Sequence, residues 1–430
     1  MSAVLAAYLA LFVVLLLFGM PVAWSMATAT VGYISFSGQW SLLPILPEKL
    51  FQGMDVFILV AIPMFLLAGE IFNQGGIAQR LIDLSDKLVG WLTGGLGQVA
   101  IAASIFFAGI TGVALGEIAA LGRIFIPAMT KAGYPAPLAA AIVASASIIG
   151  PTIPPSLPII VYGSVTNVSI GGMFAAAVVP GVLLGLVQMA LVWFIARRLG
   201  IKPEPADRSL PAIGRAGSRA ALAIGMPVII LGSILGGLMT PTEAAGMSAA
   251  YALVVGLVVY RSLKLAQLPE ILRGSVAFSG QLIIIVACGA AFGWVMGFEN
   301  VTGRLATEVA SWNLGPVGTM LLANILLLIL GMFIDPSASI ILFAPILAPA
   351  AAAVGIDPLH FGVVVILNLN IGLLTPPLGV SLFAVERIAG CGLTPVIRAA
   401  LPFIAVNLVA LLLVSAVPWL SLALPRLAGF

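Results

Sequence analysis

Charged residues are scarce in this chain. Asp, Glu, Lys and Arg make up 8% of its 430 residues, whereas hydrophobic residues make up 62%. A water-soluble protein needs many more polar side chains to cover its surface. The composition therefore excludes an ordinary soluble domain and predicts a chain that is solvated mainly by lipid.

Cysteine and histidine are almost absent. Cys288, Cys391 and His360 are the only residues of these two types, so neither a disulfide framework nor a zinc site is supported. The sequence also offers no Ser/His pair, paired acids or metal ligands at a spacing suited to catalysis. An intramembrane enzyme is thus disfavoured, and we expect no organic cofactor and no nucleic-acid partner.

Long uncharged segments are abundant, and a membrane span needs roughly 20 apolar residues. We identify eleven such segments, at residues 4–26, 56–71, 96–126, 136–162, 173–196, 220–239, 244–259, 277–298, 316–352, 359–385 and 395–424. The first is expected to be a retained membrane helix rather than a signal peptide. Segments 96–126, 316–352 and 395–424 reach or pass about 30 residues, which favours re-entrant hairpins, paired spans or strong tilt.

Basic residues gather in one place between these segments. Six of the 18 Lys and Arg residues lie between positions 197 and 219. They are Arg197, Arg198, Lys202, Arg208, Arg215 and Arg219. The positive-inside rule places such a loop in the cytoplasm, and the loop divides the chain into two apolar halves.

The two halves share a motif. In each half, a glycine is followed 21 positions later by a double proline, and a second glycine lies just before that pair. The residues are Gly133, Gly150, Pro154 and Pro155 in the first half and Gly355, Gly372, Pro376 and Pro377 in the second. Paired features of this kind are typical of inverted repeats in secondary transporters, so we expect two inverted repeats.

A lone acidic residue also precedes a proline by ten positions in each half: Glu117 before Pro127, and Asp335 before Pro345. An ionised carboxylate at membrane depth costs on the order of 3 kcal/mol, so both side chains are expected to line a cavity or to have partners. For Glu117 the alternative is a salt bridge or a helix N-cap. For Asp335 the alternative is an N-cap ahead of Pro336.

The double prolines predict a broken helix in each half. Proline removes a backbone donor and clashes with the preceding turn, so carbonyl groups become free. Such backbone is tolerated at membrane depth where it is buried in protein or lines a watery cavity, and there it can coordinate a cation. Residues 150–156 and 370–377 are therefore candidate sites. The alternative is a kink used only for packing.

Two further stretches, residues 109–117 and 331–339, lie midway in long apolar segments and are rich in glycine or contain Asp-Pro. They predict the turns of two re-entrant hairpins. Helices that begin at such turns would present unpaired N–H groups to an anion. Nearby, Asn368 is expected to make structural hydrogen bonds, and Arg123 to extend toward the membrane surface.

These stretches together resemble the large membrane subunit of tripartite ATP-independent periplasmic (TRAP) transporters over essentially the full length of the chain. The motifs that carry the resemblance are Ile126-Pro127-Ala128-Met129 with Gly133-Tyr134, Ile153-Pro154-Pro155-Ser156, Thr240-Pro241-Thr242-Glu243-Ala244-Ala245, Gly331-Met332-Phe333-Ile334-Asp335, and Gly372-Leu373-Leu374-Thr375-Pro376-Pro377-Leu378-Gly379.

The resemblance implies an elevator-type transporter in the bacterial inner membrane, with a scaffold and a moving transport domain. It implies sodium-coupled uptake of a carboxylate-bearing solute, delivery by a periplasmic solute-binding protein, and a separate small four-helix membrane subunit. Sodium is the expected coupling ion, ahead of the proton.

On this basis the chain divides into six parts. These are scaffold helices at 1–95, first-repeat transport elements at 96–196, the basic loop at 197–219, scaffold helices at 220–315, second-repeat transport elements at 316–394, and a C-terminal helix region at 395–430. The hairpins are expected at about 96–130 and 316–352, and the broken helices at about 136–162 and 359–385.

The expected site residues come from the hairpins and breaks. The sodium candidates are Thr111, Gly112, Glu117, Gly150, Thr152, Asp335, Ser337, Asn370, Gly372 and Thr375. The substrate candidates are Gly116, Pro154, Pro155, Ser156, Ser339, Pro376 and Pro377.

The first hairpin departs from the family pattern, which usually has a Ser-Gly-Ser-Ser-like tip, whereas residues 111–117 here read Thr-Gly-Val-Ala-Leu-Gly-Glu. Hydroxyl ligands are therefore fewer. Either Glu117 supplies an oxygen to sodium, or it titrates in a proton-coupled variant. A second hypothesis is a sodium- or proton-coupled anion symporter of related two-hairpin fold that works without a binding protein.

Overall fold

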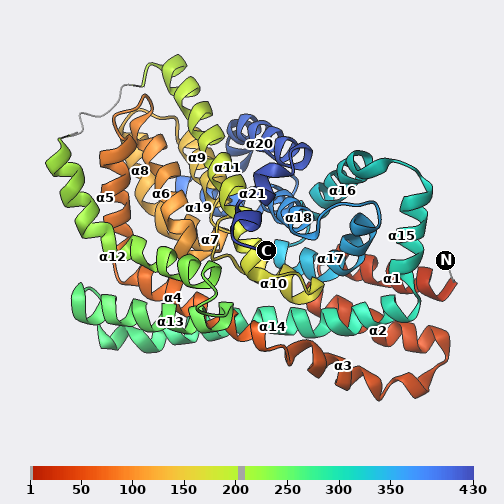
Figure 1. The fold of residues 1–430 in the computed structure, drawn as a ribbon. Helices are drawn as coiled ribbons and strands as arrows, with labels where there is room; N and C mark the ends of the chain where they lie inside the picture. Colours follow the sequence, from red (N-terminus) through yellow and green to blue (C-terminus); the bar gives the residue numbers. More distant parts are fainter. Residues whose placement is uncertain (1–2, 202–208) are drawn as a thin grey trace.

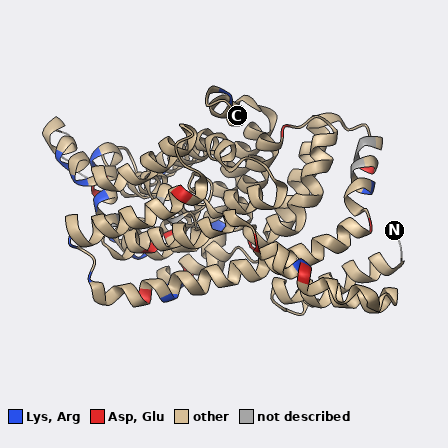
Figure 2. Ribbon diagram, turned by 60° about the horizontal axis from the view of Figure 1, so that its bottom comes forward, with Lys and Arg blue, Asp and Glu red and all other residues tan. Residues whose placement is uncertain are grey.

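The computed structural model describes residues 3–201 and 209–430, without the side chains of residues 78, 110, 111, 306, 309 and 310. Within these residues all regular structure is helical, and seven helices are long and apolar enough to cross a membrane. The prediction of an all-α, multi-pass membrane protein is therefore confirmed. Figure 2 shows how sparsely charged residues occur along the ribbon.

The N-terminal helices spread along the lower edge of the molecule in Figure 1, from α1 at the right to α5 at the left. They are α1 (Ala3–Leu17), α2 (Val22–Ser37), α3 (Ile45–Met54), α4 (Ala61–Gln74) and α5 (Ile77–Val89). The prediction of a single helix over 4–26 is wrong. Gly19 adopts a left-handed φ of 81° and Pro21 caps α2, so the apolar run is split in two.

Four helices of the second half lie against the N-terminal helices. They are α12 (Leu210–Leu235), α13 (Pro241–Val254), α14 (Leu268–Phe298) and α15 (Val301–Ser311). Helix α13 packs on α4, α12 packs on α5, and the long α14 runs past α2, α3 and α4 (Figure 1). Thr240 and Glu243 form a reciprocal capping box around Pro241, which explains why this motif begins α13.

The first half then forms a hairpin followed by an interrupted helix. The hairpin consists of α6 (Gly95–Thr111), α7 (Ala114–Glu117), the wide turn η3 (Ile118–Gly122) and α8 (Arg123–Lys131). Next come α9 (Ala136–Ser147), α10 (Leu157–Thr166) and the long α11 (Ile170–Leu199). The predicted hairpin turn and the predicted break before α10 are both present.

The same succession occurs later in the chain. Helices α16 (Gly315–Gly331) and α17 (Pro336–Ala353) form a second hairpin, and α18 (Pro358–Gly372) and α19 (Val380–Ala389) flank a second break. They are followed by α20 (Leu393–Ala416) and α21 (Trp419–Leu427). The segment 395–424 is thus one long helix and a short one, separated at Pro418. Both double prolines contain a cis peptide bond.

Short 3₁₀- or π-helical turns adjoin some of these helices. They are η1 (Trp40–Leu42), η2 (Phe57–Val60), η4 (Val255–Val259) and η5 (Leu265–Gln267).

A buried polar cluster joins helices of the two halves. Gln188 of α11 donates to Asn407 Oδ1 of α20 at 3.0 Å, and Asn407 donates to Ser145 Oγ of α9 at 3.1 Å. All three side chains are fully buried. Hydrogen bonds in so apolar an interior fix the relative register of the helices, because leaving any partner unpaired is costly.

The basic loop is shorter than predicted. Arg197 and Arg198 belong to the last turn of α11, and Arg215 and Arg219 lie within α12. The two helices can include these arginines because long arginine side chains can extend out of the apolar layer. Lys202 and Arg208 lie outside the described residues.

Candidate functional site

The two hairpin turns and the two breaks converge on one cavity of about 80 Å³. Four helices begin at its wall. The first residues of these helices that line it are Ala114 and Leu115 of α7, Leu157 and Pro158 of α10, Pro336 and Ser337 of α17, and Val380 of α19. Helix N-termini carry unpaired N–H groups and a partial positive charge, so the wall is suited to an anion.

The opposite helix ends also reach this cavity. Pro151 follows α9, while Asn370 and Leu373 lie at the end of α18. The carboxyl ends of helices carry free carbonyl groups and partial negative charge, which favours a cation. The cavity can therefore bind an anionic group and a cation next to each other.

Asn370 links the two breaks. Its Nδ2 donates to Thr152 Oγ1 at 3.1 Å, and Thr152 Oγ1 donates in turn to the Ile148 carbonyl at 2.8 Å. Asn370 is fully buried, and its Oδ1 has no hydrogen-bond partner among the described residues. A buried amide oxygen that lines a cavity and lacks a donor is a natural ligand for a hard cation.

Hydroxyl groups satisfy carbonyls that the breaks set free. Thr375 Oγ1 donates to the Ile371 carbonyl at 2.8 Å, and Ser156 Oγ donates to the Pro151 carbonyl at 2.5 Å. A hydroxyl that donates its one proton keeps its lone pairs. These oxygens are therefore available as acceptors or cation ligands.

Asp335 is the N-cap of α17, which was the alternative expected from its position before Pro336. Its Oδ1 accepts from the Ser337 backbone N–H at 2.9 Å. The residue lines the cavity and is exposed. Asp335 therefore fixes the start of α17 and still brings a carboxylate to the site.

Glu117 occupies a different place from Asp335, so the predicted equivalence of these two acids is wrong. Val113 is the N-cap of α7, and Glu117 is the fourth residue of that helix. The fourth residue of α17 is Ser339, whose fully buried Oγ has no hydrogen-bond partner in the described part of the chain. The spacing to proline misled because Pro345 lies ten residues after the N-cap Asp335, whereas Pro127 lies 14 residues after the N-cap Val113.

The Glu117 carboxylate is fully buried and lies against Gly150. A Cβ at position 150 would overlap Oε1 and would lie 3.1 Å from Oε2. Glycine is therefore required here to let the carboxylate of the hairpin reach the first break.

Glycines also bring the hairpin turns onto the breaks. Gly112, at a left-handed φ of 58°, is so close to the first break that a Cβ would lie 2.9 Å from the Pro155 carbonyl oxygen. In the second half, a Cβ on Gly372 would lie 2.6 Å from the Gly331 carbonyl oxygen. Each hairpin thus contacts its break through backbone.

The predicted residues are only partly gathered at the cavity. Gly112, Asp335, Ser337 and Asn370 line it. Gly150, Thr152, Ser156, Gly372, Thr375, Glu117 and Ser339 lie in or beside the breaks and hairpins without lining it. The side chain of Thr111 lies outside the described part.

The double prolines lie farther from the cavity than predicted. Pro154 and Pro155 are buried, Pro376 is half-buried and Pro377 is exposed, and none of them lines the cavity. They shape the breaks, whereas Pro151 and Leu373, near the ends of α9 and α18, line the cavity.

A larger groove of about 440 Å³ adjoins the cavity. Val113, Leu115 and Phe278 line both spaces. The groove also contains Gly116 and, from α4 and α14, Glu70, Asn73 and Ser275. Sequence reasoning missed the residues of α4 and α14. Glu70 and Asn73 were detectable as polar residues in an apolar helix, whereas Phe278 carries no signal in the sequence.

Asn368 makes the structural hydrogen bonds predicted for it, because its Nδ2 donates to the carbonyl and Oδ1 oxygens of Asn324, each at 2.9 Å. Arg123 begins α8 and is exposed.

Known proteins resemble this chain in fold and in sequence. The YdaH transporter of Alcanivorax borkumensis has a similar fold, with a TM-score of 0.64, 18% sequence identity and 90% coverage of each chain. The C4-dicarboxylate TRAP transporter large permease protein DctM of Pseudomonas aeruginosa is 41% identical over 383 residues, or 89% of each chain. The sialic acid TRAP transporter large permease protein SiaM of Vibrio cholerae is 38% identical, with 96% of each chain covered.

These relatives are named as transport proteins, which confirms the prediction that the chain is not an enzyme. A family model described as the DctM component of the tripartite ATP-independent periplasmic transporter matches residues 9–420, nearly the whole chain. With identity of about two fifths to a curated large permease, the chain belongs to the DctM family of TRAP transporter large permeases.

Proposed function

We propose that this chain is the permease of a sodium-coupled uptake system for an organic acid in the bacterial inner membrane. A periplasmic solute-binding protein delivers the acid, and a small four-helix membrane subunit accompanies the chain. The observation that carries the proposal is the convergence of four helix N-termini and two helix C-termini on one cavity.

The helix N-termini are suited to the carboxylate of the substrate. Seven wall residues belong to the first turns of α7, α10, α17 and α19. The relatives named for C4-dicarboxylate and for sialic acid support an acid as the substrate class. The carboxylate group is the feature that both names share.

Sodium is assigned to the breaks. Asn370 Oδ1 is buried without a donor among the described residues, and Thr152 Oγ1 lies next to its amide. Backbone carbonyls near Gly150 and Gly372, together with the Thr375 hydroxyl, complete the oxygen set that a hard cation requires. Glu117 is assigned to the sodium site on the side of the first hairpin.

The two spaces at the site suggest how substrate enters. A cavity of about 80 Å³ is far below the few hundred cubic ångströms typical of pockets that hold a small organic ligand, whereas the groove of about 440 Å³ lies within that range. Substrate therefore approaches from the groove, and the cavity expands when the hairpin tip moves away from Phe278.

Such movement is that of an elevator. The transport domain comprises residues 96–196 and 316–394 as two inverted repeats, and the scaffold comprises 1–95 and 220–315. The groove lies at their boundary, between the first hairpin and helices α4 and α14. Movement at this boundary exposes the cavity to each side of the membrane in turn.

The test is uptake into liposomes that contain the purified chain and its small subunit. We expect uptake of the acid only with an inward sodium gradient and the cognate binding protein together. Uptake that is driven by sodium without the binding protein would instead support an independent symporter. Uptake driven by a pH gradient alone would replace sodium by the proton.

A further inference from the structure

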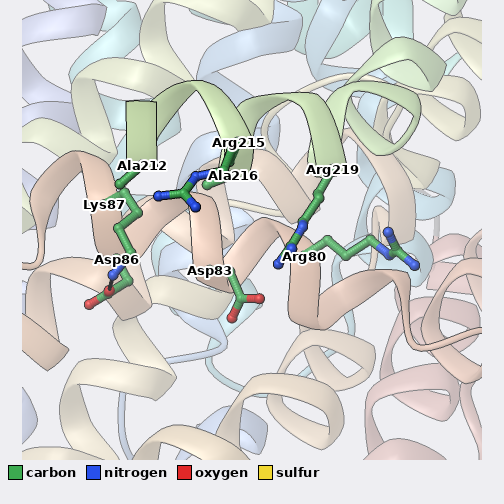
Figure 3. Close-up of a pocket in the computed structure, with 8 residues that line it drawn as sticks. All are labelled: Arg80, Asp83, Asp86, Lys87, Ala212, Arg215, Ala216 and Arg219. Atoms are coloured by element: carbon green, nitrogen blue, oxygen red, sulfur yellow. Dashed lines mark hydrogen bonds and ion pairs between the residues drawn. The ribbon is translucent and has the colours of Figure 1, made fainter. Parts of the chain in front are cut away.

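A second polar groove shares no lining residue with the transport cavity. It is a groove of about 340 Å³ between α5 and α12, two helices that pack against each other. Figure 3 shows side chains from both helices facing this groove. The charged residues that line it are Arg80, Asp83, Asp86 and Lys87 of α5 and Arg215 and Arg219 of α12.

The groove has an excess of positive charge. Four basic and two acidic side chains line it, which leaves a formal net charge of 4 − 2 = +2. Lys87 pairs with Asp86 at 2.9 Å. None of the three arginines forms an ion pair with a residue that the structure describes. An anion would complete the charge balance.

The arginines are held in place by neutral contacts. The Arg80 guanidinium lies 3.5 Å from the centre of the Tyr260 ring, and the Tyr260 hydroxyl donates to the Arg219 carbonyl at 2.8 Å. Arg215 Nε donates to the Pro211 carbonyl at 3.2 Å. The contacts of Arg80 and Arg215 orient those two guanidinium groups and leave their charge uncompensated, whereas the Tyr260 bond holds the backbone of Arg219.

Two alanines make room between the helices. Ala212 and Ala216 line the groove on α12, one turn apart and on the same face as Arg215 and Arg219. Larger residues there would fill the space that lies between the basic side chains. The groove therefore has free space next to the basic side chains of Arg215 and Arg219.

The surroundings of the groove are those of a membrane surface. Helix α12, which carries the groove residues Ala212 to Arg219 in its first half, is a candidate span of 26 residues, and Val228 and Ile229 farther along it are exposed. Beside the groove on α5, Leu88 and the following Trp91 are also exposed. Apolar side chains around a basic groove fit the acyl chains and headgroup of one lipid.

We infer that the groove between α5 and α12 binds the phosphate group of an anionic phospholipid, held by Arg80, Arg215 and Arg219. The bound lipid bridges α5 and α12. Because α5 leads directly into α6 of the first hairpin, the lipid holds the connection between the outer helices and that hairpin. The site does not depend on which ion drives transport.

The test measures binding of single phosphatidylglycerol molecules to the delipidated full chain by native mass spectrometry. The variant is Arg215→Gln with Arg219→Gln. The matched control is Arg197→Gln with Arg198→Gln, which removes the same charge from the end of α11, outside the groove. Each basic residue near anionic lipid contributes about fivefold to binding, so the loss of two should weaken binding in the variant roughly 30-fold.

Three results would overturn the inference. The first is equal weakening in the control, which would indicate a diffuse surface potential. The second is unchanged binding in the variant. The third is inorganic phosphate binding to the chain as tightly as the lipid does, which would indicate a soluble ligand. Arg215→Lys with Arg219→Lys retains the charge and should bind better than the glutamine variant, which guards against a folding defect.

Discussion

The amide of Asn370 donates to the hydroxyl of Thr152 at 3.1 Å, across 218 residues of sequence. This hydrogen bond joins the broken helix of the first half to that of the second. Both residues are almost completely buried. An ion bound at either break would therefore affect the position of both.

Replacing Asn370 by alanine should weaken sodium activation of uptake. The change removes the cavity oxygen and the hydrogen bond to Thr152, and the loss of one buried hydrogen bond costs about 1–3 kcal/mol. We expect the sodium concentration for half-maximal uptake to rise about tenfold. The control is Asn368→Ala on the same helix, which removes only the bonds to Asn324. It should lower the thermal stability and leave the sodium dependence unchanged; the reverse pattern would refute the assignment.

Glu117→Gln should reduce sodium-driven uptake more than about tenfold, because it replaces a charged ligand by a neutral one of the same size. The measurement compares uptake under a sodium gradient with uptake under a pH gradient. Sodium dependence identical to that of the parent chain would exclude Glu117 from the sodium site. Loss of uptake driven by the pH gradient alone would favour a titrating role.

Gly372→Ala should destabilise the protein by about 1–3 kcal/mol, because the new methyl group meets the backbone of Gly331, which cannot rotate away. A lower midpoint of thermal unfolding in detergent would show this. Gly293→Ala is the control, since Gly293 is exposed within α14 and has no atom within 4 Å of its added Cβ. That variant should be neutral or slightly stabilised. Equal effects of both changes would contradict the close contact.

Phe278→Ala should weaken the separation between the cavity and the groove, because this ring lines both. We expect sodium to leak into liposomes without substrate and the substrate KM to rise. A sodium-sensitive dye inside the liposomes reports the leak. Phe298→Ala, an exposed position at the end of the same helix, should show neither effect. A Phe278→Ala variant that shows no sodium leak and an unchanged KM would argue against the ring as a barrier between the two spaces.

The sequence allowed the helical fold, both hairpins and both breaks to be predicted, because proline and glycine act locally. Pro154 and Pro376 interrupt helices wherever they lie in the fold, and Asp335 caps the helix that begins at Pro336. These effects need no knowledge of the tertiary structure. They account for the agreement near residues 112, 150, 335 and 372.

Long-range contacts could not be predicted in the same way. The pairing of Asn370 with Thr152, and the approach of Phe278 to the hairpin tip, depend on how helices distant in sequence pack. The match of Glu117 with Asp335 failed because equal spacing to a proline does not fix the position within a helix. The first apolar segment was predicted to be one helix, but Gly19 and Pro21 divide it into α1 and α2.

The contact between Gly331 and Gly372 has a mechanical consequence. Two backbones that touch without side chains have no rotamer through which the contact can loosen by degrees. The second hairpin and its broken helix must then travel as a single rigid block. The first hairpin also touches its break through backbone, at Gly112 and Pro155. The movement that opens the site to the aqueous phase therefore has to occur at the groove between the first hairpin and helices α4 and α14.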